Sequence, residues 1–160
     1  MIKICVFSDS HGSAAPMIAA IEREQPALCF FLGDGERDLK QVQERFPALP
    51  FYAVRGNCDL RSKLSESLVC NVDGVHIFAA HGHLYDVKYE ADLETLTAAA
   101  KQAGAGLALF GHTHCACLRR EGGITVLNPG AVAFTSKPSY AVVSVENGRF
   151  TAEIRRAEKT

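Results

Sequence analysis

Five short motifs in the first 114 residues contain aspartate, asparagine or histidine. In each motif this residue is accompanied by a glycine or by a second residue of these three types. Each motif directly follows a short apolar run of the kind that forms a buried strand. In α/β proteins, ligands bind at the carboxyl ends of sheet strands. We therefore expect these side chains to meet at one place. The five motifs are Asp9-Ser10-His11, Gly33-Asp34, Gly56-Asn57, His81-Gly82 and Gly111-His112-Thr113-His114.

The donor atoms of these motifs indicate a metal site. Their oxygen and nitrogen ligands suit Mn, Fe, Zn or Ni better than a soft metal such as Cu(I). The two Asp, one Asn and four His are too many for one tetrahedral ion, but they suffice for two ions that share a bridging carboxylate. Two ions about 3.5–4 Å apart clamp a phosphoryl group and produce a nucleophilic hydroxide near neutral pH. The set therefore favours in-line hydrolysis of a phosphoester.

In two of the motifs the candidate ligands are two residues apart, as in Asp9 and His11 or His112 and His114. On extended backbone this spacing points both side chains the same way. Each motif alone also has an ordinary explanation as a helix cap, a turn or a hydrogen-bonded loop histidine. Because all five follow predicted strands, a common site explains them better than five separate coincidences.

The first half of the chain alternates between apolar runs and amphipathic segments. This pattern predicts strands over 2–8, 27–32 and 51–54, with helices over 13–25 and 36–46 between them. A β-α-β-α-β order implies a parallel sheet with right-handed crossovers. The first three motifs would then lie at the carboxyl edge of that sheet.

The second half of the chain is rich in hairpin signals. Asp73-Gly74, Gly122-Gly123 and Asn147-Gly148 are turn sequences between strand-like runs, and each predicts a hairpin. A helix over 90–103 and a strand over 107–110 lie between the first two hairpins. The whole pattern predicts one α/β domain over residues 1–160, built as two stacked sheets with helices outside.

The bulk composition restricts the other functions that the chain could have. It is 48% hydrophobic and 22% charged with a net charge of −1, which is typical of a globular protein. This balance gives no electrostatic case for nucleic acid or an anionic membrane as a partner. We expect no signal peptide and no membrane-spanning helix. The six cysteines are expected to be reduced thiols of a cytoplasmic protein.

In order and residue type, the five motifs resemble the signature of the calcineurin-like metallophosphoesterases. Further segments are similar to those of the small bacterial and archaeal phosphodiesterases of the YfcE type within that family. These segments are Arg55-Gly56-Asn57-Cys58-Asp59, His81-Gly82-His83 and Asn128-Pro129-Gly130. The resemblance implies a four-layer α-β-β-α sandwich of two mixed β-sheets flanked by helices. It also implies a two-metal hydrolase that cleaves phosphodiesters by in-line attack of a metal-bound hydroxide.

Carried over motif by motif, the resemblance implies that Asp34 bridges two divalent ions and acts in catalysis together with Asn57 and His81. The expected ions are Mn²⁺, with Ni²⁺, Zn²⁺ or Fe as alternatives. The first ion would be held by Asp9, His11, Asp34 and His114. The second would be held by Asp34, Asn57, His81 and His112.

One position departs from the family pattern. Many members continue Gly-Asn with a histidine, where this chain has Cys58. A thiol is a poorer proton donor to a leaving group, so we expect Cys58 to contact substrate without a proton role. Asn57 is a further candidate substrate contact. His83 is either a contact or hydrogen-bond partner beside the site, or a solvated loop residue.

Two alternatives to a phosphodiesterase stay open. The same site could hydrolyse phosphomonoesters, because the residues outside the motifs that line the cleft are not evident from the sequence. The chain could also be a non-catalytic, metal-binding scaffold that resembles the retromer subunit of this fold. The expected partner is a small phosphoester substrate, and the family likeness suggests a homodimer or homotetramer.

Overall fold

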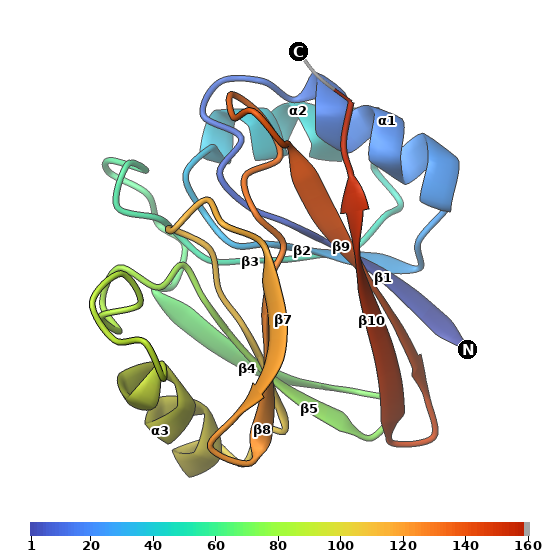
Figure 1. Ribbon diagram of the computed structural model, residues 1–160. Helices are drawn as coiled ribbons and strands as arrows, with labels where there is room; N and C mark the ends of the chain where they lie inside the picture. Colours follow the sequence, from blue (N-terminus) through green and yellow to red (C-terminus); the bar gives the residue numbers. More distant parts are fainter. Residues whose placement is uncertain (159–160) are drawn as a thin grey trace.

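The apolar runs of the sequence form two five-stranded β-sheets that face each other, with helices on their outer faces (Figure 1). This computed structural model describes residues 1–158. The first sheet contains β1 (Ile2–Phe7), β2 (Leu28–Phe31), β3 (Phe51–Ala53), β9 (Ser139–Glu146) and β10 (Arg149–Arg156). Its strand order is β10-β9-β1-β2-β3, with β1, β2 and β3 parallel and β9 antiparallel to both of its neighbours, β1 and β10.

The second sheet is assembled from the middle of the chain. It contains β4 (Ser67–Val72), β5 (Val75–Ala80), β6 (Leu107–Leu109), β7 (Cys117–Glu121) and β8 (Ile124–Asn128). The strand order is β4-β5-β6-β8-β7, in which β5, β6 and β8 are parallel and the two edge strands antiparallel. Both sheets are therefore mixed, and each of the three predicted turn sequences does close a hairpin.

Three apolar layers hold the sheets and helices together. Phe30 and Leu107 belong to the layer between the two sheets. Met17 lies in a second layer, between the first sheet and helices α1 (Ala15–Glu24) and α2 (Glu36–Arg45). Leu96 lies in a third, between the second sheet and helix α3 (Glu94–Gln102). The helices thus cover opposite outer faces, which confirms the predicted α-β-β-α order (Figure 1).

Two hairpin turns fasten the sheets together at one end of the sandwich. The Asp73 carboxylate accepts a hydrogen bond from the Asn147 backbone N–H at 2.9 Å. The Asp73 carbonyl accepts another from the Gly148 N–H at 2.7 Å. These turns lie where β1 and β5 begin, so they leave the opposite end, where both strands finish, free for the loops that carry the candidate ligands.

Helix α3 begins four residues later than the sequence pattern predicts, at Glu94 rather than residue 90. Leu93 is in the left-handed region (φ 55°), so the helical backbone cannot extend back through it. Glu90 instead caps the helix from outside, because its carboxylate accepts hydrogen bonds from the Thr95 N–H and hydroxyl at 2.9 and 2.8 Å. The other predicted elements agree with the structure to within about two residues, the usual uncertainty of element ends.

Within residues 1–158, none of the helices combines the length and the apolar character needed to cross a membrane. All six cysteines are free thiols, as predicted. Cys5 and Cys29 are buried and face each other across β1 and β2, where they pack as small apolar side chains.

Glu24, at the carboxyl end of α1, is a buried carboxylate surrounded by donors. Tyr140 donates to it at 2.7 Å, and Arg155 reaches both of its oxygens at 2.7 and 2.5 Å. The Lys3 ammonium lies 3.6 Å away. Burial acts to raise the pKa of Glu24, but these hydrogen bonds and charges outweigh it and lower the pKa below its ordinary value. The cluster thereby ties α1 to β1, β9 and β10.

Glu24→Gln is expected to lower the free energy of unfolding at neutral pH by about 1–3 kcal/mol, because it removes charge-assisted hydrogen bonds from a buried site. The lowered pKa sets the pH dependence. The stabilisation is complete above the unfolded-state pKa of about 4.3 and is lost as the pH falls through the lower folded-state value. Urea unfolding of both proteins from pH 7 to pH 3 measures this, and the difference between them should shrink towards pH 3.

Glu22→Gln is the matched control on the same helix. Glu22 forms an exposed ion pair with Arg45, and such pairs contribute about 0–1 kcal/mol. A Glu24→Gln protein whose loss of stability was the same at pH 3 as at pH 7 would contradict the assignment.

Candidate metal centre

The loops that follow the parallel strands of both sheets meet at the end of the sandwich opposite the two hairpin turns. Within the first sheet, the Asp9 N–H donates to the Gly33 carbonyl at 3.0 Å and the His11 N–H to the Asp34 carbonyl at 3.1 Å. The sheets are joined here by His81, at the end of β5, whose Nδ1–H donates to the Leu32 carbonyl after β2 at 2.7 Å. These contacts hold the loops after β1, β2 and β5 against one another.

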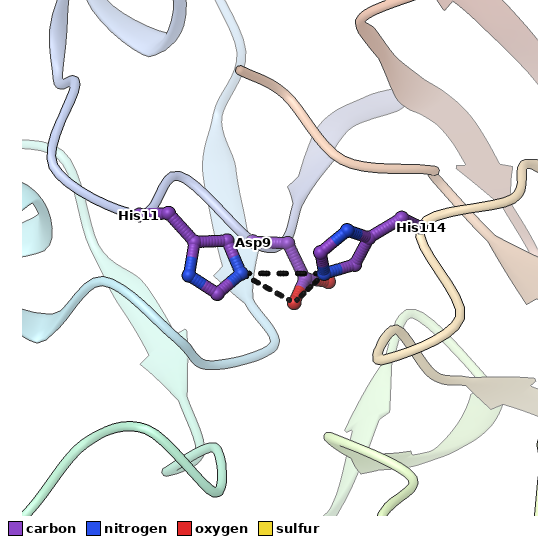
Figure 2. Close-up of side chains that lie close together, drawn as sticks. All are labelled: Asp9, His11 and His114. Atoms are coloured by element: carbon purple, nitrogen blue, oxygen red, sulfur yellow. Dashed lines mark hydrogen bonds and ion pairs between the residues drawn. The ribbon is translucent and has the colours of Figure 1, made fainter. Parts of the chain in front are cut away.

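Asp9, His11 and His114 form the first group of candidate ligands (Figure 2). The Asp9 Oδ1 atom lies 3.2 Å from His114 Nε2 and 3.4 Å from His11 Nε2. The two Nε2 atoms are themselves 3.2 Å apart. One carboxylate oxygen and two imidazole nitrogens, delivered by the loops after β1 and β6, therefore converge on one point.

Asp34, His81 and His112 form the second group. The Asp34 Oδ2 atom lies 3.2 Å from His81 Nε2, and the rings of His81 and His112 are 5.1 Å apart between centroids. The same oxygen lies 3.8 Å from His11 Nε2 in the first group. The Asp34 carboxylate therefore stands between the two groups, in the place predicted for a bridging ligand.

Hydrogen bonds to the far side of Asp9 and of His81 leave the atom that faces the ligand groups without a hydrogen bond. Asp9 Oδ2 accepts from the Ser8 hydroxyl at 2.5 Å and the His112 N–H at 3.1 Å, whereas Oδ1 is buried and has no hydrogen bond. His81 donates Nδ1–H to Leu32, so in the neutral imidazole the buried Nε2 carries the lone pair, and this atom is also without a hydrogen bond. Buried polar atoms without partners are rare. These two atoms, aimed into the groups, fit ligands of a divalent cation oriented by their own hydrogen bonds.

The charges of the site are consistent with a cation there. Burial acts to raise the pKa of Asp34, but the His81 imidazole, whose protonated form places a positive charge 3.2 Å from Oδ2, outweighs it and lowers the pKa. Burial lowers the pKa of His112 to about 4, helped by the nearby charge of His81. At neutral pH Asp34 is thus an anion and His112 a neutral imidazole, which are the forms that bind a divalent metal.

The backbone of the ligand loops differs from the extended conformation expected from the two-residue spacing. Asp9, His11, Asp34, His112 and His114 all have positive φ, between 45° and 69°. The left-handed region costs a non-glycine residue about 1–3 kcal/mol and concentrates at functional sites. The expectation of extended backbone was wrong. The paired side chains converge because the loop backbone turns sharply through left-handed residues, and not because side chains alternate along a strand.

Two glycines of the motifs are required by close approach. A Cβ on Gly56 would lie 2.0 Å from Asp34 Oδ1, and a Cβ on Gly111 would lie 2.0 Å from the Ser8 hydroxyl. Neither position can hold a side chain without displacing a group that orients Asp34 or Asp9. The glycines that accompany the ligands in the sequence thus let neighbouring loops pack against the ligand carboxylates.

The remaining predicted residues border this centre. Asn57 and Cys58 are exposed, and the Cys58 N–H donates to Asp34 Oδ1 at 2.7 Å. The Cys58 thiol forms with His11 and Asp34 a further group that could hold a cation. The His83 ring packs 5.5 Å from His81 and 6.1 Å from His112, with Nδ1 buried. His83 is therefore a neighbour of the second group rather than a solvated loop residue.

Two residues that the sequence analysis did not assign to the site hold its loops in place. Asp59 accepts four backbone hydrogen bonds, from Asp34, Gly35, Glu36 and Gly56, at 2.8–3.1 Å. Asn128, at the end of β8, donates to the Gly111 carbonyl at 3.1 Å and the Thr113 hydroxyl at 2.9 Å. Asp59 lies in the motif after β3, but nothing in the sequence pairs it with the start of α2.

Comparison with known proteins finds similarity to phosphoesterases by sequence and by structure. The model of the calcineurin-like phosphoesterase superfamily domain matches residues 2–148. The probable metallophosphoesterase YsnB of Bacillus subtilis is 29% identical over 154 residues, which are 94% of this chain and 88% of that protein. A crystal structure from Streptococcus pneumoniae, described as a predicted phosphoesterase, matches with a TM-score of 0.80 and 28% identity over 97% of this chain and 89% of that one.

Two more distant structures share the fold alone. Vps29 from Entamoeba histolytica, solved in complex with Zn²⁺, has a TM-score of 0.75 and 21% identity over 97% of this chain and 99% of its own. A structure described as a novel archaeal phosphodiesterase has a TM-score of 0.72 and 19% identity over 96% of this chain and 100% of its own. The fold of this chain is therefore shared with a protein described as a phosphodiesterase and with the zinc-bound Vps29.

Proposed function

The chain belongs to the calcineurin-like phosphoesterase superfamily, and from this premise we propose that it is a hydrolase of small phosphodiesters that uses two divalent metal ions. The observation that carries the proposal is the position of Asp34 Oδ2, 3.2 Å from His81 and 3.8 Å from His11. One carboxylate there links two groups of ligands, as a binuclear site requires.

The chain's own residues would divide the work as follows. Asp9, His11 and His114 would hold one ion, and His81 and His112 the other, with Asp34 shared by both. Asn57 would join the second ion, as the family resemblance implies. Ions bound there would lower the pKa of bound water and offset the charge that builds on the phosphoryl oxygens. The hydrogen bonds to Leu32, Ser8 and Cys58 fix the orientation of the ligands beforehand. Mn²⁺ is the ion that we expect, because the donors are oxygen and imidazole nitrogen.

The groups around the centre favour a diester over a monoester. Burial and the charge of His81 lower the pKa of His83, and burial together with Asp34 raises the pKa of the Cys58 thiol. Both side chains are therefore uncharged at neutral pH, as is Asn57. A monoester carries more negative charge than a diester, and these neighbours offer no charge to match it. The fold shared with an archaeal phosphodiesterase supports the same preference.

A metal-by-substrate matrix tests the proposal. Protein stripped by a chelator is assayed on bis(para-nitrophenyl) phosphate and on para-nitrophenyl phosphate after addition of Mn²⁺, Ni²⁺, Zn²⁺, Fe²⁺ or Mg²⁺ singly. We expect stripping to abolish hydrolysis, Mn²⁺ to restore it with two ions per chain, and the diester to be the better substrate. Preference for the monoester would favour a phosphomonoesterase. A chain that stays inert with every metal would favour the non-catalytic scaffold.

Cys58 leads to a second expectation, that aryl diesters are hydrolysed faster than alkyl diesters. A neutral thiol is a weak proton donor, and a poor alkyl leaving group suffers most from the lack of a general acid. Cys58→His should raise kcat for an alkyl glycerophosphodiester by about tenfold or more, since a well-placed acid contributes about 10²–10⁴-fold, and should change the aryl rate little. Cys58→Ser is the control. Equal rates on both diesters in the parent, with chemistry limiting, would contradict this reading.

The sequence predictions of a cytoplasmic location and of a homodimer or homotetramer remain proposals. Light scattering on the purified chain measures the second.

A further inference from the structure

A cleft of about 820 Å³ opens beside the candidate metal centre. Its lining includes the further candidate ligand group of His11, Asp34 and Cys58, and it extends along α2 and the loop after β3. An α-helix rises about 1.5 Å per residue, so Lys40 lies roughly 6 Å beyond Glu36 at the helix start. The cleft is therefore longer than a single phosphoryl group requires.

Three exposed basic side chains line the cleft: Arg37, Lys40 and Arg61. Arg37 and Lys40 are three residues apart on α2 and so project from the same side of the helix. Among residues 1–158, none of the three forms an ion pair, whereas Arg45, Arg55 and Arg119 each pair with a glutamate. Their charges are thus available to a ligand.

Two of the acidic side chains that line the cleft, Asp38 and Asp59, already accept hydrogen bonds from the protein. The Asp38 carboxylate accepts hydrogen bonds from the Ser10 hydroxyl at 2.5 Å and the Gly12 N–H at 2.8 Å. The Asp59 carboxylate accepts the four backbone hydrogen bonds described above. Glu36 is the one lining carboxylate outside the ligand set without such bonds among the described residues. The charges that the open part of the cleft exposes most are consequently those of the three basic side chains, because Asp38 is buried and Glu36 and Asp59 are only partly exposed.

We propose that the three basic side chains of this cleft bind a second anionic group of the substrate, a phosphate or a carboxylate several bonds away from the phosphodiester that is cleaved. The inference rests on the proposed function and narrows its substrate class to diesters that carry such a group. The phosphodiester would lie at the ligand groups, and the second anion would lie between the turn at Arg61 and the first two turns of α2. Arg37, Lys40 and Arg61 are then specificity-determining residues.

Two matched substrates test this inference. Thymidine 5′-(para-nitrophenyl phosphate) and its 3′-phosphorylated derivative release the same leaving group and differ in the second anion. With Mn²⁺ present, we expect the derivative to have a KM about tenfold lower, equivalent to about 1.4 kcal/mol. The advantage should shrink as salt is added, because exposed charges are screened. A 3′-O-carboxymethyl analogue shows whether a carboxylate serves as well as a phosphate.

Variants assign the effect to the cleft. Arg37→Gln combined with Lys40→Gln should remove the KM advantage of the phosphorylated substrate and leave kcat and the other substrate unchanged. Arg61→Asn should remove part of it, and asparagine tolerates the positive φ at that position. Lys101→Gln combined with Arg149→Gln removes the same charge from outside the cleft and should have no effect. Equal KM values in the parent, or equal losses in both double variants, would overturn the inference.

A binding measurement separates this inference from the proposed function. Calorimetry with thymidine 3′,5′-bisphosphate and thymidine 5′-monophosphate needs no turnover. The parent should bind the bisphosphate about tenfold more tightly, and the Arg37→Gln/Lys40→Gln protein should lose that preference. If the chain bound with this preference but hydrolysed neither ester, the proposed function would fail and the anion-binding cleft would stand. Equal binding of both nucleotides overturns the cleft, whatever the activity.

Discussion

Asp34→Asn is expected to lower kcat/KM for a phosphodiester by at least about 10³-fold, at the upper end of what one polar group at a reacting centre contributes, while the protein stays folded. The retained amide oxygen can still accept the Cys58 N–H, which donates to Asp34 Oδ1 at 2.7 Å. The new NH₂ group would occupy the place of Oδ2, between His81 and His11. An amide nitrogen is not a metal ligand, so both groups of ligands lose the carboxylate that they share.

Metal analysis makes this prediction specific. The Asp34→Asn protein should hold fewer than two Mn²⁺ ions per chain after dialysis, and excess Mn²⁺ should not restore the parent rate. Asp86→Asn is the matched control, because Asp86 is an exposed loop aspartate that also has positive φ, of 53°. A variant that kept two ions and more than about a tenth of the rate, a deficit of less than about 1.4 kcal/mol, would show that Asp34 does not bridge.

Asp59→Ala is expected to destabilise the protein by about 2–4 kcal/mol, because hydrogen bonds to a charged group contribute about 1.5–3 kcal/mol each and this half-exposed site lets water replace some of them. Asp59 receives four backbone N–H groups, from the loop after β2, the start of α2 and the loop after β3. Without it, the loops that carry Asp34 and Asn57 lose their common attachment. Urea unfolding measures the stability.

The same variant should bind Mn²⁺ about 10–100-fold more weakly, the usual effect of removing a group that orients metal ligands. Asp59 contributes no atom to the three candidate ligand groups, so a lower affinity would come from the loops that it positions. Asp59→Asn keeps one oxygen, so its stability and its Mn²⁺ affinity should be intermediate. This second variant provides the test if Asp59→Ala does not fold. Weaker stability with unchanged metal affinity would limit Asp59 to a structural role.

Local sequence patterns were sufficient to predict most of the elements of this fold. The Asp73-Gly74, Gly122-Gly123 and Asn147-Gly148 turns depend on the conformational preferences of the turn residues themselves, and each does form a hairpin. Helix α3 was the exception. Its start depends on the left-handed Leu93 and on the cap from Glu90, and both follow from how the preceding loop packs.

The candidate ligands could be predicted because their chemistry and their position after apolar runs are both written in the sequence. Residue types and strand ends led to the same six Asp and His side chains that converge in the structure. The reason why these side chains converge could not be predicted from the sequence. The strained backbone of the loops is imposed by contacts between segments distant in sequence, such as His81 with Leu32, 49 residues apart.

By itself, the sequence determined the order of strands and helices, the hairpins and the set of candidate metal ligands, because those depend on neighbouring residues and on chemical type. Only the tertiary structure decided which oxygen of Asp9 is free, that Asp59 and Asn128 hold the loops, and that Arg37, Lys40 and Arg61 face one cleft. These features arise between loops of two separate sheets. Their residues have no fixed spacing along the chain, and so no local sequence pattern predicts them.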